Sequence, residues 1–235
     1  MILYVNGDSY TEHHDDFSVY PIFLHKKLNG SLINRAVRGS SNDRLYRSTI
    51  EDIIKLKRTQ RQNIFVLLAL SFVGREELWA PESTDKDVVE RFQNGDPNCR
   101  LVTREYLDRS QLTDKQVEEF VEEDVNTMWA RFYSRFFMFV NTLENLNVPY
   151  FIFSGAPNEN SMTNLNYIFG TEMYQILEKK KNILNIFDLS IPKWAKENNI
   201  PTKSTGHLID SEGHEKFADY LYNQHLKEIW KEYVV

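Results

Sequence analysis

The sequence predicts an α/β protein: a three-layer α/β/α sandwich around a mostly parallel central sheet of about five strands. Short apolar segments rich in β-forming residues alternate along the chain with longer segments whose apolar residues recur at helical spacing. Residues 63–71 are almost wholly apolar, which indicates a central strand buried on both faces. We expect a single domain over residues 1–235, because this length, with 41% hydrophobic residues, suffices for one large core.

Each element follows from its local pattern. Five apolar segments predict strands, at residues 1–5, 31–37, 63–71, 149–154 and 185–189. Four segments with helical spacing predict helices, at residues 17–28, 42–56, 114–146 and 212–233. Residues 74–110 are polar, charged and without periodicity, so we expect an insertion at the carboxyl edge of the sheet. A lid or specificity loop and a surface loop without function both remain open for it.

Composition excludes several classes of protein. The net charge of -6 gives no broad basic surface, so we expect no nucleic-acid partner. The single cysteine, Cys99, rules out a disulfide within the chain and fits a cytoplasmic protein. We expect no signal peptide, because Asp8 interrupts the first apolar run, and no membrane span, because no apolar run is long enough. A homo-oligomer remains open, because the aromatic residues of segment 114–146 lie on more than one helix face.

The turn Gly7-Asp8-Ser9 directly follows the first predicted strand. In an open parallel sheet, ligand chemistry gathers at the carboxyl ends of the strands. A serine at that position can present its hydroxyl as a nucleophile beside a free backbone N–H. The same three residues are also common in ordinary turns, so this motif alone does not decide between the two interpretations.

Three further stretches fall at comparable places. Residues 34–44 join a strand end, the turn glycine Gly39 and a helix start with capping residues. Residues 69–72, Ala-Leu-Ser-Phe, end the central strand, and residues 206–214 precede the last helix and contain two histidines.

This ordered set resembles the SGNH hydrolases, the GDSL-type esterase and lipase superfamily, in a divergent bacterial or phage-type form. The resemblance spans the whole chain and implies a flavodoxin-like three-layer fold. It implies that Ser9 is the nucleophile, that the backbone N–H groups of Ser9 and Gly39 form the oxyanion hole, and that His207 is the catalytic base. His214 then matches the structural end of the last motif.

Two positions depart from the family pattern. Ser71 stands where the resemblance implies an oxyanion-binding Asn, and a serine hydroxyl can still donate one hydrogen bond. Ser204 stands where the acid that orients the histidine is expected. We therefore predict that Asp210, or a main-chain carbonyl, accepts from Nδ1–H of His207. Activity should then be modest and fall below a pH of about 6.5, the ordinary range of histidine.

The leading interpretation is a serine ester hydrolase that removes acyl groups, acetyl above all, from a polar substrate such as a modified carbohydrate. A non-catalytic ligand- or carbohydrate-binding protein on a degenerate fold, and an acyltransferase, remain as alternatives. We expect Asp8, Asn42, Arg44 and Arg75 to contact the substrate, Arg75 as the group that grips an anion or a sugar. We expect no metal and no cofactor.

Overall fold

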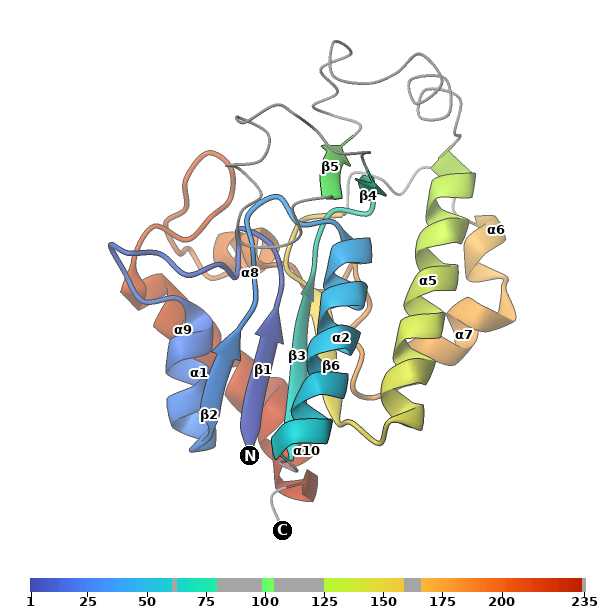
Figure 1. Ribbon diagram of the computed structural model, residues 1–235. Coiled ribbons are helices and arrows are strands. Elements are labelled where there is room, and N and C mark those ends of the chain that lie inside the picture. The colour runs from blue at the N-terminus through green and yellow to red at the C-terminus, as the bar shows by residue number, and fades with distance from the viewer. Residues whose placement is uncertain (61–62, 80–98, 104–124, 159–165, 234–235) are drawn as a thin grey trace, which may run out of the picture.

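The computed structural model describes residues 1–60, 63–79, 99–103, 125–158 and 166–233. Four parallel strands form its central sheet, in the spatial order β2-β1-β3-β6 (Figure 1). The strands are β1 (Ile2–Asn6), β2 (Ser31–Asn34), β3 (Ile64–Leu70) and β6 (Tyr150–Ser154). Because β1 lies between β2 and β3, the chain reverses its direction of travel across the sheet at β1. Such a reversal opens a crevice at the carboxyl ends of the strands.

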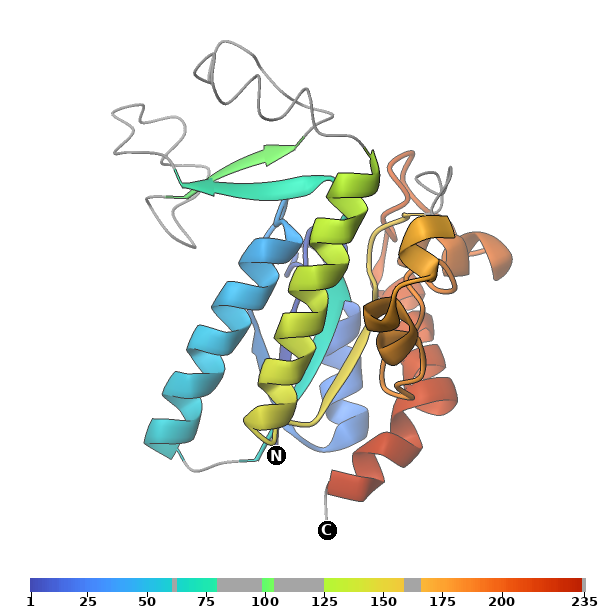
Figure 2. The same cartoon turned by 90° about the vertical axis from the view of Figure 1, so that its right-hand side faces the viewer.

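Helices cover both faces of this sheet (Figures 1 and 2). Alternate residues of each strand point to opposite faces, and the two faces build two separate apolar clusters. One face carries α2 (Asn42–Gln60), α5 (Val125–Asn145), α6 (Asn166–Phe169) and α7 (Glu172–Glu178). The other carries α1 (Tyr20–Leu28), α8 (Ile191–Glu197), α9 (Ser211–Leu221), the π-helical turn η4 (Tyr222–Leu226) and α10 (Lys227–Tyr233).

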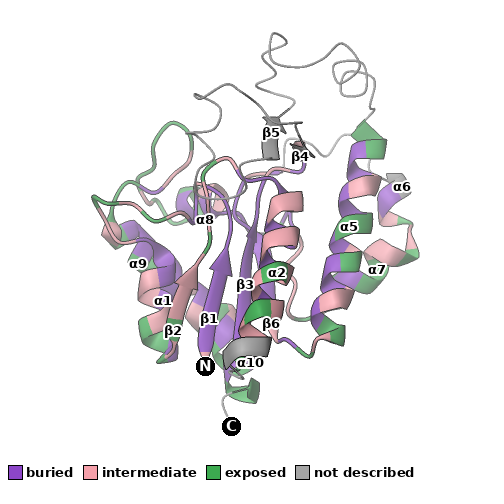
Figure 3. Ribbon diagram, in the orientation of Figure 1, coloured by how far each residue is buried: buried purple, intermediate pink, exposed green. Residues whose placement is uncertain are grey.

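The central strands are fully buried, as their apolar composition requires. Every residue of β1, β3 and β6 is buried, whereas β2 at the sheet edge is only partly so (Figure 3). At about 25 cal/mol for each Å² of apolar surface removed from water, these strands supply much of the hydrophobic stabilisation. The resulting rigid sheet fixes the positions of the loops at its carboxyl edge.

The structure confirms the predicted α/β class, with three corrections. The parallel sheet has four strands among the described residues, since 185–189 forms none; Ile183 makes only a single parallel bridge to Ile152. The predicted insertion contains an antiparallel pair, β4 (Arg75–Trp79) and β5 (Cys99–Thr103). The last helix is divided into α9, η4 and α10. The predicted helix 114–146 is described from Val125 onward, and its first part lies outside the described residues.

No helix within the described parts of the chain combines the length and the apolar character needed to cross a membrane.

Candidate active site

Ser9 lies in a tight turn that begins where β1 ends. The carbonyl oxygen of Asp8 accepts hydrogen bonds from the backbone N–H groups of Thr11 and Glu12, both at 2.9 Å. Gly7 is required here because a Cβ at this position would lie 2.6 Å from Thr11 Oγ1 and 2.8 Å from Thr11 Cβ. The turn leaves the Ser9 side chain partly exposed, although its neighbours Asp8 and Tyr10 are buried.

His207 meets Ser9 from a loop that precedes α9. Its Nε2 lies 2.8 Å from Ser9 Oγ, although the two residues are 198 positions apart. Two hydrogen bonds of 2.8 Å close the loop, from Lys203 N to the His207 carbonyl and from Gly206 N to the Lys203 carbonyl. Gly206 has a φ of 81°, which a residue with a side chain rarely adopts. The geometry is that of a hydroxyl paired with a base.

The expectation that Asp210 orients His207 is wrong in this structure. Nδ1 of His207 lies 2.8 Å from Thr205 Oγ1, and Asp210 instead caps α9 by accepting from Gly213 N at 2.8 Å. Asp210 starts the helix because its short carboxylate satisfies a free N–H of the first turn. Ser204, at the position where the family acid is expected, is exposed.

The surroundings of His207 disfavour its protonated form. Burial lowers the pKa of His207 to about 4, and the positive charges of Lys203, Arg38 and Arg75 act in the same direction. A histidine with this pKa is neutral at physiological pH and can accept a proton from Ser9.

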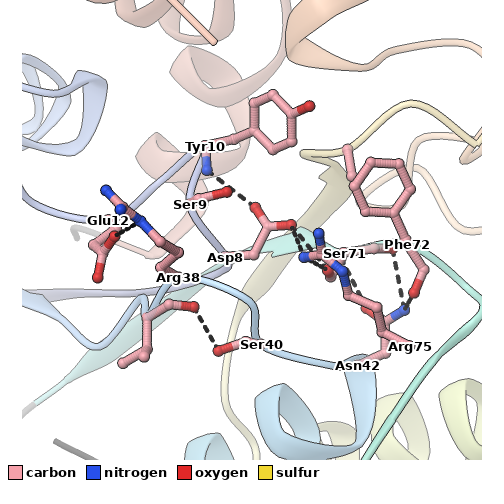
Figure 4. Close-up of polar contacts among 12 residues, drawn as sticks. Asp8, Ser9, Tyr10, Glu12, Arg38, Ser40, Asn42, Ser71, Phe72 and Arg75 are labelled. Carbon is pink, nitrogen blue, oxygen red and sulfur yellow. Dashed lines mark hydrogen bonds and ion pairs between the residues drawn. The ribbon is translucent and has the colours of Figure 1, made fainter. Parts of the chain in front are cut away.

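Asp8 is the centre of a buried polar network beside the turn (Figure 4). Its carboxylate accepts from Tyr10 N at 3.1 Å, from Ser71 Oγ at 2.8 Å and from Arg75 Nη1 at 3.1 Å. The guanidinium of Arg75 also bonds Ser71 Oγ at 3.0 Å and lies over the ring of Phe72. Burial raises the pKa of Asp8, and Arg75 is the strongest of the groups that oppose the rise.

This network changes the roles expected for Asp8 and Ser71. Both side chains are completely buried, so Asp8 cannot contact a substrate as expected. The Ser71 hydroxyl is already bonded to Asp8 and Arg75, so it is not available as an oxyanion donor. The pair Asp8 and Arg75 instead joins the end of β1 to the start of β4.

Asn42 is likewise structural and not a substrate contact. Its side chain is buried, donates to the carbonyls of Ser71 and Phe72, and accepts from Ser71 N at 2.9 Å. It therefore joins the first turn of α2 to the end of β3. Arg44 lies two residues further along α2, and its Nη1 donates to Ser40 Oγ at 3.0 Å. Gly39 occupies the preceding turn with a φ of 75°.

The other histidines that follow the turn do not contact Ser9 in place of His207. His13 is exposed, and His14 stacks on Phe17 at 4.6 Å between ring centroids. His214 is buried against Phe17 and Tyr20, in keeping with a structural role.

Sequence reasoning missed Thr205 and Tyr10. The Tyr10 ring stacks on the His207 ring at 4.1 Å between centroids and 4° between planes, and its hydroxyl donates to the Thr205 carbonyl at 2.8 Å. Thr205 stands two residues before His207, so a short loop there can bring its hydroxyl to the imidazole ring. Nothing in the sequence pointed to a contact between Tyr10 and a loop almost 200 positions away.

No family model and no curated protein matches this sequence. Among solved structures, the chain is similar to the psychrotrophic esterase EstA from Pseudoalteromonas sp., in a crystal structure inhibited by monoethylphosphonate. The match has a TM-score of 0.51 and 12% sequence identity, and it covers 98% of each chain. At this identity the likeness shows the fold: the chain shares its α/β architecture, from end to end, with an esterase.

Proposed function

We propose that the protein is a serine ester hydrolase that uses Ser9 as nucleophile and His207 as base. The observation that carries the proposal is the 2.8 Å contact between Ser9 Oγ and His207 Nε2 at the carboxyl edge of the sheet. A partly exposed serine paired with a neutral imidazole is what acyl transfer to a hydroxyl requires. The esterase fold of the solved relative adds support.

In this mechanism, Ser9 Oγ attacks the ester carbonyl carbon and its proton passes to His207 Nε2. The carbonyl oxygen becomes an oxyanion held by the backbone N–H groups of Ser9 and Gly39. Neither N–H donates to another backbone group within the described parts of the chain. His207 then returns the proton to the departing alkoxide, which leaves an acyl group on Ser9. Water, deprotonated by His207, releases the acid and restores Ser9.

We propose a polar ester as the substrate class, with acetylated carbohydrates as the first compounds to test. Polar and charged side chains surround the Ser9 turn: Glu12, Arg38 and Arg75 lie on three different segments near it (Figure 4). Such side chains favour hydroxyl-rich or charged leaving groups over long acyl chains.

The direct test is turnover of p-nitrophenyl acetate by the wild type, Ser9→Ala and Ser204→Ala. Ser204 is the matched control, because it is an exposed serine on the loop that carries His207. We expect Ser9→Ala to lower kcat by at least about 10³-fold and Ser204→Ala to keep kcat within about twofold. Equal turnover by the wild type and Ser9→Ala would reject the covalent mechanism. No turnover by a folded wild type on any ester would favour the non-catalytic binding protein.

A further inference from the structure

Among the residues that the structure describes, the base in this site contacts no acidic side chain. The Nδ1 atom of His207 contacts the hydroxyl of Thr205 at 2.8 Å, and Asp210 caps α9 instead. In a Ser-His-Asp triad, the carboxylate fixes the tautomer and orientation of the imidazole and stabilises its protonated form. A hydroxyl has no charge, so other contacts must supply the orientation.

Tyr10 supplies the missing contacts. Its ring lies almost parallel to the His207 ring, with 4.1 Å between centroids and 4° between planes. Its hydroxyl donates to the carbonyl of Thr205 at 2.8 Å, so the same side chain also holds the residue that contacts Nδ1. Tyr10 is only 4% exposed, which restricts its ring to this position.

Tyr10 also belongs to the turn that carries the nucleophile. It directly follows Ser9, and its backbone N–H donates to Asp8 Oδ1 at 3.1 Å. The turn therefore contacts His207 at Nε2 through Ser9 and on the ring face through Tyr10. Any displacement of the loop at 203–207 breaks several of these contacts together.

We propose that Tyr10 and Thr205 form a neutral clamp that positions His207 in place of an acid. Thr205 Oγ1 accepts from Nδ1–H, which leaves Nε2 free to take the Ser9 proton. Tyr10 holds the plane of the ring and the backbone of Thr205. This inference rests on the proposed esterase function and names two positioning residues for it.

A neutral clamp has a chemical consequence that a carboxylate would not have. A hydroxyl can donate as well as accept, so Thr205 permits both tautomers of His207, whereas a carboxylate permits only Nδ1–H. It also leaves the imidazolium without a counter-ion. Within the described residues, the cations that act on the ring are Lys203 of its own loop and Arg38 and Arg75 of neighbouring segments, and protonation of His14 would act in the same direction. The nearby carboxylates of Glu12 and Asp8 are paired with Arg38 and Arg75.

The clamp is tested by four variants, Thr205→Ser, Thr205→Val, Thr205→Asp and Tyr10→Phe. The readouts are kcat, KM, the pH dependence of kcat/KM, and the pKa of His207 from NMR titration of its ring protons. Thr205→Ser retains the hydroxyl and should keep kcat within about twofold. Thr205→Val keeps the shape and loses the acceptor, so kcat should fall about tenfold with KM little changed.

Thr205→Asp gives Nδ1 of His207 a charged partner and is the most decisive of the four variants. The pKa of His207 should rise by at least about one unit, and the acid limb of kcat/KM should move with it. We expect kcat at pH 8 to rise about tenfold, because the carboxylate stabilises the imidazolium formed in the transition state. Tyr10→Phe keeps the stacked ring and removes the hydroxyl that donates to the Thr205 carbonyl, so kcat should fall about fivefold.

Folded Thr205→Val and Tyr10→Phe with wild-type kcat would overturn the clamp. So would a Thr205→Asp protein whose His207 pKa and acid limb are unchanged. The NMR titration needs no turnover, so it decides the contact at Nδ1 even where no ester is hydrolysed. Failure of the esterase proposal is recognised separately, by a Ser9→Ala variant as active as the wild type.

Discussion

The pH below which activity is lost reports the pKa of the catalytic base. If His207 takes the Ser9 proton, kcat/KM is proportional to the fraction of His207 that is neutral. Burial and the cations around it lower the pKa of His207 from 6.5 to about 4. The neutral base therefore persists as the pH falls, and activity should be lost only below a pH of about 4, about tenfold for each further unit. An ordinary histidine would lose activity from a pH of about 6.5, the limit that the sequence alone suggested.

The difference between these two cases is large at pH 5.5. With a pKa of 6.5, about a tenth of the base would be neutral, whereas with a pKa near 4 nearly all of it is. The assay is kcat/KM for p-nitrophenyl acetate at constant ionic strength from pH 3.5 to 8, followed at an isosbestic wavelength. Circular dichroism at each pH separates titration of the base from unfolding.

A pair of lysine variants identifies the cause of the shift. Lys203 is the strongest charged influence on His207, so Lys203→Gln should move the acid limb to higher pH. Lys181→Gln is the control, because Lys181 pairs with Glu232 and does not act on His207. An acid limb near pH 6.5 in the wild type would refute the reasoning. An acid limb of kcat/KM at the same pH in both lysine variants would refute the role given to Lys203.

Three other predictions concern the supports of the site. Gly206→Ala places a Cβ 2.9 Å from the Pro192 ring at a φ of 81°, so we expect a lower Tm and at least about a tenfold loss of kcat as His207 shifts. Arg75→Gln leaves the buried Asp8 carboxylate without its cation. Urea unfolding at pH 7 should therefore give a free energy of unfolding about 3 kcal/mol lower than that of the wild type, and this difference should shrink toward pH 4 as Asp8 becomes protonated. Burial lowers the pKa of His214 to about 4 in the folded protein. As the pH falls below about 6.5, His214 therefore becomes protonated in the unfolded chain before it does so in the folded protein. Stability should drop by about 2 kcal/mol from this group between pH 7 and 4.5, and His214→Phe should remove that part of the slope. Each prediction has an outcome that would contradict it. For Gly206→Ala it is a Tm equal to that of the wild type, and for Arg75→Gln it is an unchanged urea midpoint. For His214→Phe it is a free energy of unfolding that depends on pH as strongly as in the wild type.

The strands of the sheet were predictable because their signal is local. The apolar run at β3 and the shorter runs at β1 and β6 each point to a buried strand without reference to the rest of the chain. The expected strand at 185–189 fails for an equally local reason. The Asn185 side chain accepts from the Phe187 N–H, which forms a turn in place of an extended segment.

The candidate site was predictable only in part. Ser9 and His207 stand at motif positions, and the structure brings their side chains together. It was not predictable that Thr205, and not Asp210, contacts Nδ1 of His207. An aspartate that caps a helix and an aspartate that orients a histidine look alike in a sequence. The hydrogen bond between Ser71 and Asp8 could not be predicted for another reason: Asp8 lies 63 positions away and reaches Ser71 only because β1 and β3 pair in the sheet.

Covalent labelling shows whether Ser9 is a nucleophile activated by His207. The protein is incubated with a fluorophosphonate at pH 7.5, and its intact mass and peptide masses are then measured. We expect one phosphonyl group per chain, attached to Ser9, with labelling slowed by at least about 10³-fold in His207→Gln. Labelling of a different residue, or labelling of Ser9 at the same rate without His207, would contradict it.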